Sequence, residues 1–165
     1  MAEFADTAHA HGLAAGASVF DAEAVDLAAR HLDFLKLAAR EAENYPLIQM
    51  VWRAAMGKRT LRSISDIKNY DERLPFIHLF AIQKYPAGMV ESLAALFRWS
   101  AFAKSRGLLW GWSSHTTGDL DCVVAARLGA FAIEKHFALM PSNIEAPHSL
   151  LPAAFAAMAA KVRGN

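Results

Sequence analysis

Two histidines, a glutamate and a run of hydroxyl groups are the side chains of this sequence best suited to metal binding or catalysis. His115 follows the apolar stretch LLWGW and two serines. In Glu134-Lys135-His136 a carboxylate and an imidazole are two residues apart, so both point to one face if this stretch is a strand. Imidazole is a common metal ligand and general base. The spacing permits a shared metal or catalytic site, while two separate, hydrogen-bonded histidines are the alternative.

The elements that must position these residues lie between residues 110 and 139. This stretch is typical of a strand, a polar turn, a helix and a second strand. The two histidines stand at matching ends, His115 after the first strand and His136 within the second. Polar groups at the strand ends of a β-α-β unit are where α/β folds place their functional sites.

Composition excludes several classes of protein. The 165 residues are 55% hydrophobic and 20% charged with a net charge of +1, which favours one globular domain and argues against nucleic-acid binding. Cys122 is the single cysteine, so no internal disulfide can form. No run reaches the ~18 apolar residues that span a bilayer, and the first residues lack a signal-peptide core. We expect a soluble, cytoplasmic protein with no membrane partner.

Strands and helices alternate along the whole chain. We expect strands at 13–20, 33–39, 58–65, 76–86, 108–114 and 130–139. We expect helices at 2–11, 21–32, 44–57, 89–107, 119–128 and 151–163. The expected buried faces are Ile48, Val51, Trp52 and Ala55 in the third helix, and Leu93, Leu96, Phe97 and Ser100 in the fourth. Residues 66–75 are too few for a full crossover helix, and 140–149 are expected to form a polar loop. This alternation predicts a parallel sheet covered by helices, with no linker that would divide it.

Each predicted strand ends in polar side chains. They are Ser18, Lys36 with Glu41, Ser63, Gln83 with Tyr85, Ser113 with His115, and Glu134 with His136. The carboxyl ends of parallel strands converge on one face of a barrel, where active sites are built. A lysine, hydroxyls, two imidazoles and carboxylates suit an anionic substrate and a divalent cation such as Mn²⁺, Mg²⁺ or Zn²⁺. Lys36 could instead extend to the surface along its aliphatic stem.

Several short motifs occur together in a specific order. They are SVFD (18–21), FLKLAARE (34–41), NYPLI (44–48), KYP (84–86), WSSHT (112–116) and IEKHF (133–137), with a weaker continuation in APHSLLP (146–152). In these motifs the chain resembles the sialic acid synthase (N-acetylneuraminate synthase) family. That family condenses phosphoenolpyruvate with an N-acylated hexosamine such as N-acetylmannosamine, so the resemblance implies the same class of transferase here.

The resemblance also implies roles for individual residues. His115 and His136 would bind the divalent metal, Mn²⁺ or Mg²⁺, with Glu134 supporting the metal site. Lys36 would hold the phosphate or carboxylate of phosphoenolpyruvate, and Glu41 would contact the sugar and move a proton. The remaining substrate contacts would come from Ser18, Ser63, Gln83, Tyr85 and Ser113.

Departures from the family pattern shape the expected fold. The resemblance begins after the first two strands of an eight-stranded barrel. We therefore expect one partial domain over residues 1–165: an incomplete TIM-type (β/α) barrel of about six parallel strands alternating with helices. No C-terminal antifreeze-like domain is expected. The family's acidic PDH motif is replaced by Pro147-His148, so we expect a hydroxyl-binding carboxylate to be missing.

Two functions remain open at this point. One is a synthase of small molecules, completed by self-association or by a complementing chain. The other is a catalytically inactive barrel fragment that serves as a binding or interaction module. A partial barrel has open strand edges, which favour association with another chain.

Overall fold

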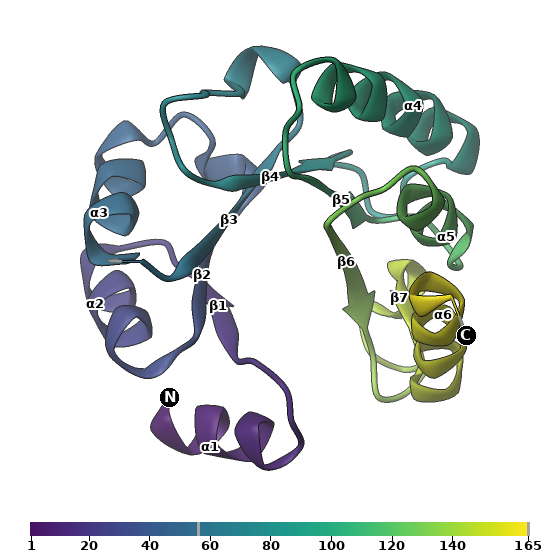
Figure 1. Ribbon diagram of the computed structural model, residues 1–165. Coiled ribbons are helices and arrows are strands. Elements are labelled where there is room, and N and C mark those ends of the chain that lie inside the picture. The colour runs from purple at the N-terminus through teal and green to yellow at the C-terminus, as the bar shows by residue number, and fades with distance from the viewer. Residues whose placement is uncertain (56, 165) are drawn as a thin grey trace. The chain divides into compact units, whose positions relative to one another are not determined.

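The computed structural model describes residues 1–55 and 57–164, in which seven strands alternate with helices (Figure 1). These residues fall into two compact units, Met1–His78 and Leu79–Asn165. Strand β4, Ile77–Ala81, carries the chain from the first unit into the second. No helix within the described residues is both long and apolar enough to cross a membrane.

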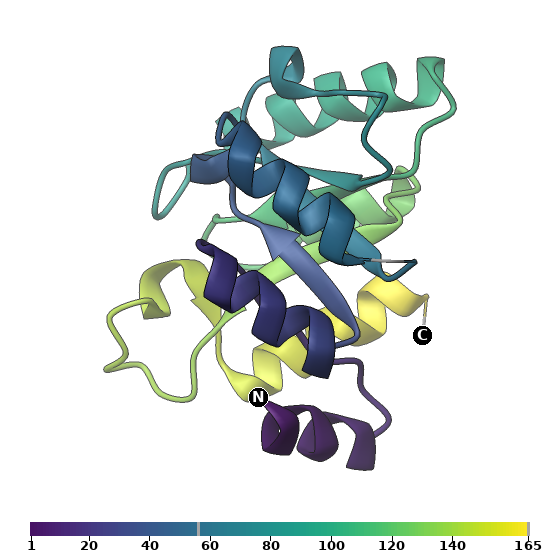
Figure 2. The same ribbon diagram turned by 90° about the vertical axis from the view of Figure 1, so that its left-hand side faces the viewer.

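The first unit contains three parallel strands in chain order. The elements are α1 (Ala2–Ala10), β1 (Gly16–Ser18), α2 (Ala22–His31), β2 (Phe34–Leu37), α3 (Tyr45–Ala55) and β3 (Arg59–Ile64), with single 3-10 turns η1 (Ala39–Glu41) and η2 (Ile67–Asn69). In the sheet, Ser18 pairs with Lys36, and Lys36 in turn pairs with Leu61. Helices α2 and α3 lie side by side along these strands (Figure 2). The predicted order of elements in this unit is correct.

Local chemistry accounts for the helices of the first unit. Asp21 caps α2 by accepting a hydrogen bond from the Ala24 backbone N–H at 2.8 Å. Val51 of α3 is buried against the sheet, whereas Trp52 is 49% exposed. The prediction that Trp52 faces the core is therefore wrong. Met56, within the range predicted for this helix, lies outside the described residues.

The second unit contains the stretch with the two histidines. Its elements are α4 (Met89–Ser105), β5 (Trp110–Ser114), α5 (Leu120–Arg127), β6 (Ala132–Phe137), η3 (Ala146–His148), β7 (Ser149–Leu150) and α6 (Pro152–Arg163). Strands β5, β6 and β7 pair in parallel, with Ser113 beside Glu134 and His136 beside Ser149. Strand β7 lies in a region that we had expected to be loop. Helix α5 lies between α4 and α6 (Figure 1).

Tight packing under α4 fixes the position of β5. Trp99 is 1% exposed and donates its indole N–H to the Gly111 carbonyl at 3.0 Å. A Cβ atom on Gly111 would lie 2.7 Å from the Ala132 carbonyl oxygen, so only glycine allows β6 to approach this closely. Phe97, predicted to face the core, is instead 53% exposed. The α/β architecture of parallel strands and covering helices agrees with the predicted fold class.

Candidate metal and substrate site

Four aromatic rings gather at the carboxyl ends of β5 and β6. The ring centroids of His115 and His136 are 5.2 Å apart, and those of His136 and His148 are 4.6 Å apart. The Tyr85 ring lies 4.3 Å from that of His115 and 5.1 Å from that of His148. The structure therefore brings together the two histidines that were singled out from the sequence, and it adds a third.

Each ring is held by a different part of the second unit. His115 directly follows β5, His136 belongs to β6, and His148 ends the turn η3. The segment that carries Tyr85 is held beside His115 by a backbone hydrogen bond from the Ala87 N–H to the His115 carbonyl, at 2.8 Å. Three connections after strands thus converge, as the geometry of parallel strands requires.

The hydrogen bond at His115 fixes which ring nitrogen carries the proton. Its Nδ1 lies 2.5 Å from the Ile82 carbonyl oxygen, which can only accept, so Nδ1 carries the hydrogen. Burial lowers the pKa of His115 and favours the neutral ring. The lone pair then lies on Nε2, whose nearest partner is the Ser113 hydroxyl at 3.5 Å. Metal-binding histidines commonly have this arrangement, with the second nitrogen donating to a backbone carbonyl.

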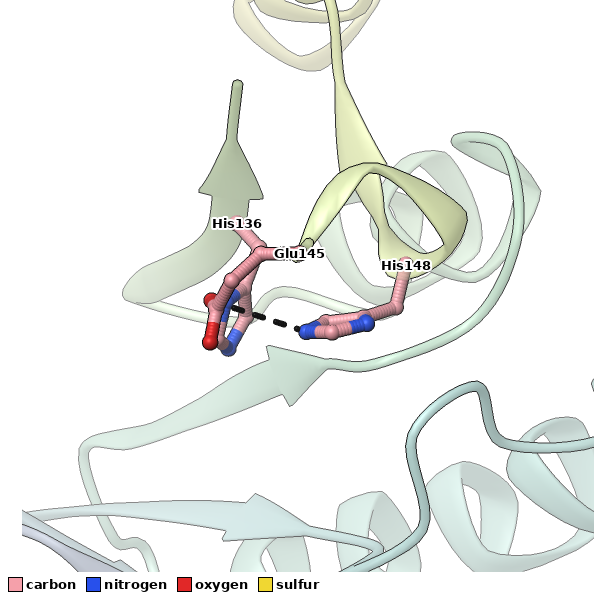
Figure 3. A group of neighbouring side chains, drawn as sticks. All are labelled: His136, Glu145 and His148. Atoms are coloured by element: carbon pink, nitrogen blue, oxygen red, sulfur yellow. Dashed lines mark hydrogen bonds and ion pairs between the residues drawn. The ribbon is translucent and has the colours of Figure 1, made fainter. Parts of the chain in front are cut away.

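Glu145 joins the other two histidines (Figure 3). Its Oε2 lies 2.8 Å from His136 Nδ1 and 3.6 Å from His148 Nε2. The hydrogen bond from His136 lowers the pKa of the Glu145 carboxyl, so this group is ionised near neutral pH. Because a carboxylate only accepts, Nδ1 of His136 carries a proton, and Nε2 is the nitrogen that can bind a metal.

These groups fit a divalent cation. One ligand atom each from His136, Glu145 and His148 lies within 4.8 Å of the others. His148 Nε2 is buried and has no hydrogen-bond partner within the described part of the chain. A buried nitrogen without a partner is costly, and coordination to a cation would satisfy it. Imidazole nitrogen with carboxylate oxygen suits Mn²⁺ or Zn²⁺ better than Mg²⁺.

A second carboxylate lies beside His115. Ser113 Oγ donates to Glu134 Oε2 at 2.6 Å, and the two residues are paired neighbours on β5 and β6. Glu134 and His136 lie two residues apart in β6, with buried Lys135 between them on the opposite side. The predicted association of Glu134 with the histidine face is consistent with this geometry, while its role in the reaction stays a prediction.

Comparisons with known proteins give the family. The model of the NeuB family matches residues 1–165. The chain belongs to the NeuB family. A curated relative, the uncharacterized protein MJ1065 of Methanocaldococcus jannaschii, is 31% identical over 136 residues, which covers 72% of this chain and 37% of that protein.

Solved structures agree with the NeuB assignment at the level of fold. An N-acetylneuraminic acid synthetase from Leptospira borgpetersenii, crystallised with citrate, matches 96% of this chain and 59% of its own with a TM-score of 0.86 and 19% identity. The spore coat polysaccharide biosynthesis protein spsE of Bacillus subtilis matches 96% of this chain and 48% of its own, with a TM-score of 0.81 and 24% identity. A DAHP synthase from Thermotoga maritima matches 98% of this chain and 53% of its own, with a TM-score of 0.72 and 16% identity. The chain thus spans about half the length of these structures, and its fold is an incomplete TIM-type barrel.

Behind the histidines, this NeuB-family chain has a buried polar network that supports the turn after β5. Asp121 is fully buried and accepts hydrogen bonds from Ser114 Oγ at 3.1 Å and Thr116 Oγ1 at 2.8 Å. Lys135 Nζ donates to Ser114 Oγ at 3.0 Å and to the Thr116 carbonyl. These bonds hold the residues on both sides of His115 and so orient its ring.

The other predicted substrate residues are found at strand ends. In the first unit, Ser18 and half-buried Lys36 are sheet neighbours, and Ser63 is buried with a hydroxyl that has no partner among the residues described. Glu41 lies in η1 and accepts a hydrogen bond from Asn44 Nδ2 at 2.8 Å. In the second unit, Gln83 is exposed in the segment after β4. Their roles toward substrate remain predictions.

Two residues of the site, Glu145 and His148, were not predicted from the sequence to belong to it. We expected the hydroxyl-binding carboxylate of the family's PDH motif to be missing, because the residue before His148 is a proline. The carboxylate comes instead from three residues before His148. A carboxylate and an imidazole nine and twelve residues after His136, in a polar loop, were the signal available in the sequence.

Proposed function

We propose that this chain belongs to a metal-assisted synthase that joins phosphoenolpyruvate to an N-acylated hexosamine, such as N-acetylmannosamine, and releases phosphate. The observation that carries this proposal is the cluster of three imidazoles, a carboxylate and a tyrosine at the ends of β5 and β6. Membership of the NeuB family and the fold shared with a sialic acid synthetase support it.

The metal would be held by His115 and His136, with His148 and Glu145 able to complete the ligand set. The two orienting bonds, from His115 to Ile82 and from His136 to Glu145, leave both Nε2 lone pairs available. When bound, a divalent cation would act as a Lewis acid toward the carbonyl oxygen of the sugar aldehyde.

Phosphoenolpyruvate would be bound by cation and hydroxyl groups. Lys36 supplies a positive charge suited to a phosphate or carboxylate, and Ser18 is its neighbour in the sheet. The buried hydroxyl of Ser63 would gain a partner from the same substrate, which offsets the cost of leaving it without one. Ser113 would contribute a further hydroxyl beside His115.

The reaction forms one carbon–carbon bond and breaks one phosphate ester. The enol carbon attacks the aldehyde carbon, and the aldehyde oxygen gains a proton. Water adds to the resulting cationic carbon and loses a proton, after which phosphate leaves with its ester oxygen. Glu41 is the proposed proton carrier, and Tyr85 and Gln83 would contact the sugar. The proposed role of Glu134 is to hold Ser113 beside the metal ligand.

Phosphate release measures this activity directly. The purified chain would be incubated with phosphoenolpyruvate, Mn²⁺ and N-acetylmannosamine, and compared with His136→Ala and with His31→Ala, which alters an exposed histidine at the end of α2. We expect release from the parent chain and from His31→Ala but not from His136→Ala. Absence of release with every N-acylated sugar, although Mn²⁺ binds, would favour the inactive binding module over the stand-alone enzyme.

A further inference from the structure

Strand β3 contains a buried arginine that the proposed reaction does not use. Arg62 is 2% exposed, and the alternation of a strand directs it to the face opposite that of Ser63. Its Nη1 donates to the Asn69 carbonyl at 2.9 Å, and its Nη2 donates to the Ala42 carbonyl. Arg62 is therefore separate from the phosphoenolpyruvate site predicted around Ser63.

No ion pair neutralises the positive charge of the buried Arg62 guanidinium within the described residues. None of the ion pairs within the described residues includes Arg62, and its Nε–H has no hydrogen-bond partner among them. Its third neighbour is a ring, with Nη1 3.3 Å from His78 Nε2. Asp71 is near enough to act on this charge electrostatically, but it makes no ion pair with Arg62 among the described residues. The cost of burying the guanidinium is therefore only partly offset.

A cavity of about 190 Å³ adjoins this arginine, and its lining is mainly polar. The charged residues that line it are Arg62, Lys68, Arg73 and Asp71. Asp71 is occupied by Arg73, with Oδ1 2.9 Å from Nε and Oδ2 2.9 Å from Nη2. Lys68 Nζ lies 3.6 Å from Asp66 Oδ2, so among the described residues Arg62 is the cation of this lining that has no carboxylate in an ion pair with it.

We infer that this cavity is a binding site for an oxyanion of phosphate size. The guanidinium of Arg62 supplies positive charge from the buried side, and Lys68 and Arg73 supply it from the exposed side. Hydrogen bonds from charged donors to an oxyanion are short and strong, and they would provide the missing counter-charge. Because Arg62 also holds the carbonyls of η2 and of Ala42, a bound anion would stabilise the short connection after β3.

Titration of the full chain with inorganic phosphate, followed by calorimetry, tests the inference. Lys68→Gln and Arg73→Gln change exposed side chains and should each weaken binding about threefold. Asp71→Asn should strengthen binding, because it removes the only negative charge of the lining and releases Arg73. A purely structural role of this polar cluster does not predict tighter binding from loss of a carboxylate.

Two further variants separate this site from the predicted substrate site. Lys36→Gln should remove at most a second binding event, at the phosphoenolpyruvate site, and should leave the event that Arg73→Gln weakens and Asp71→Asn strengthens. Arg62→Gln should reduce the affinity about tenfold or more, with circular dichroism to verify that the variant is folded. The inference is wrong if phosphate does not bind, if binding is lost in Lys36→Gln, or if Arg73→Gln and Asp71→Asn both leave the affinity as it was.

Discussion

Acid should destabilise this protein through one buried histidine outside the metal site. His78 is 2% exposed in β4, and its Nε2 lies 3.3 Å from Arg62 Nη1. A guanidinium can only donate, so Nε2 is the acceptor and the ring is neutral. Burial, and next the positive charge of Arg62, lower the pKa of His78 from 6.5 to about 4. Asp71 is the opposing carboxylate, and the Tyr70 ring packs 4.8 Å away.

The sign of the effect follows from proton binding in the two states. In the unfolded chain the histidine has an ordinary pKa near 6.5, whereas the folded protein holds it at about 4. Between these values the unfolded state binds more protons, so the free energy of unfolding falls as the pH falls. The contribution of His78 to the free energy of unfolding is complete at pH values above the pKa of the unfolded chain. It is lost as the pH falls through the pKa of the folded protein. It amounts to about 3 kcal/mol in total, and to about 2 kcal/mol between pH ~7 and pH ~5.

Urea unfolding of the parent chain and of His78→Gln isolates this contribution. Glutamine keeps an acceptor for Arg62 but does not titrate. Both proteins would be unfolded at pH ~7 and pH ~5 in phosphate-free buffer, with far-ultraviolet circular dichroism as the probe. We expect the parent chain to lose about 2 kcal/mol more than His78→Gln, a difference of about 1 M in the urea midpoint. Equal losses in the two proteins would show that His78 is not held neutral by burial beside Arg62.

Three further substitutions test the second unit. His148→Ala should weaken Mn²⁺ binding about tenfold by calorimetry, and an unchanged affinity would remove His148 from the ligand set. Asp121→Asn should lower the free energy of unfolding by about 2 kcal/mol, because its NH2 group replaces one of the two oxygens that accept from buried donors. Asp119→Asn, which breaks an exposed ion pair, should cost less than about 1 kcal/mol. Gly111→Ala should cost about 1–3 kcal/mol in urea unfolding through overlap with the neighbouring strand, and a Gly88→Ala variant, whose added Cβ meets nothing closer than 4.0 Å, should be nearly neutral.

The order of the elements could be predicted from the sequence, but the buried face of each helix was only partly readable. In α4 the predicted stripe included Phe97, yet the residue that packs on β5 is Trp99. Small side chains, Ser92 and Ser100, lie on the buried face and leave room for the indole. Leu96 and Ser100 of the predicted side are buried, so the predicted face was only partly wrong, and hydrophobicity alone could not choose between Phe97 and Trp99.

The sequence predicted those residues of the candidate site that lie in a strand or directly after one. His115 and Glu134 could be placed from the ends of long, apolar strands. Glu145 and His148 lie in a polar segment, and their position depends on the two-residue strand β7, whose Ser149 pairs with His136. Two residues show no periodicity, so only the tertiary pairing with β6 reveals that this loop returns to the histidines.

The buried Arg62 follows from the same shortage of residues that makes the connection after β3 irregular. A regular crossover would place an apolar helix over this face of β3. Residues 66–75 provide only the turn η2, and its Asn69 carbonyl points at the strand instead of pairing within a helix. A buried carbonyl needs a donor, and an aliphatic side chain at position 62 would leave both this one and that of Ala42 unsatisfied. A long side chain with five N–H groups can serve both carbonyls and the His78 ring, and its Nε–H still has no partner among the described residues. The unpaired Nε–H, and with it the anion site, is thus a consequence of covering a strand with turns in place of a helix.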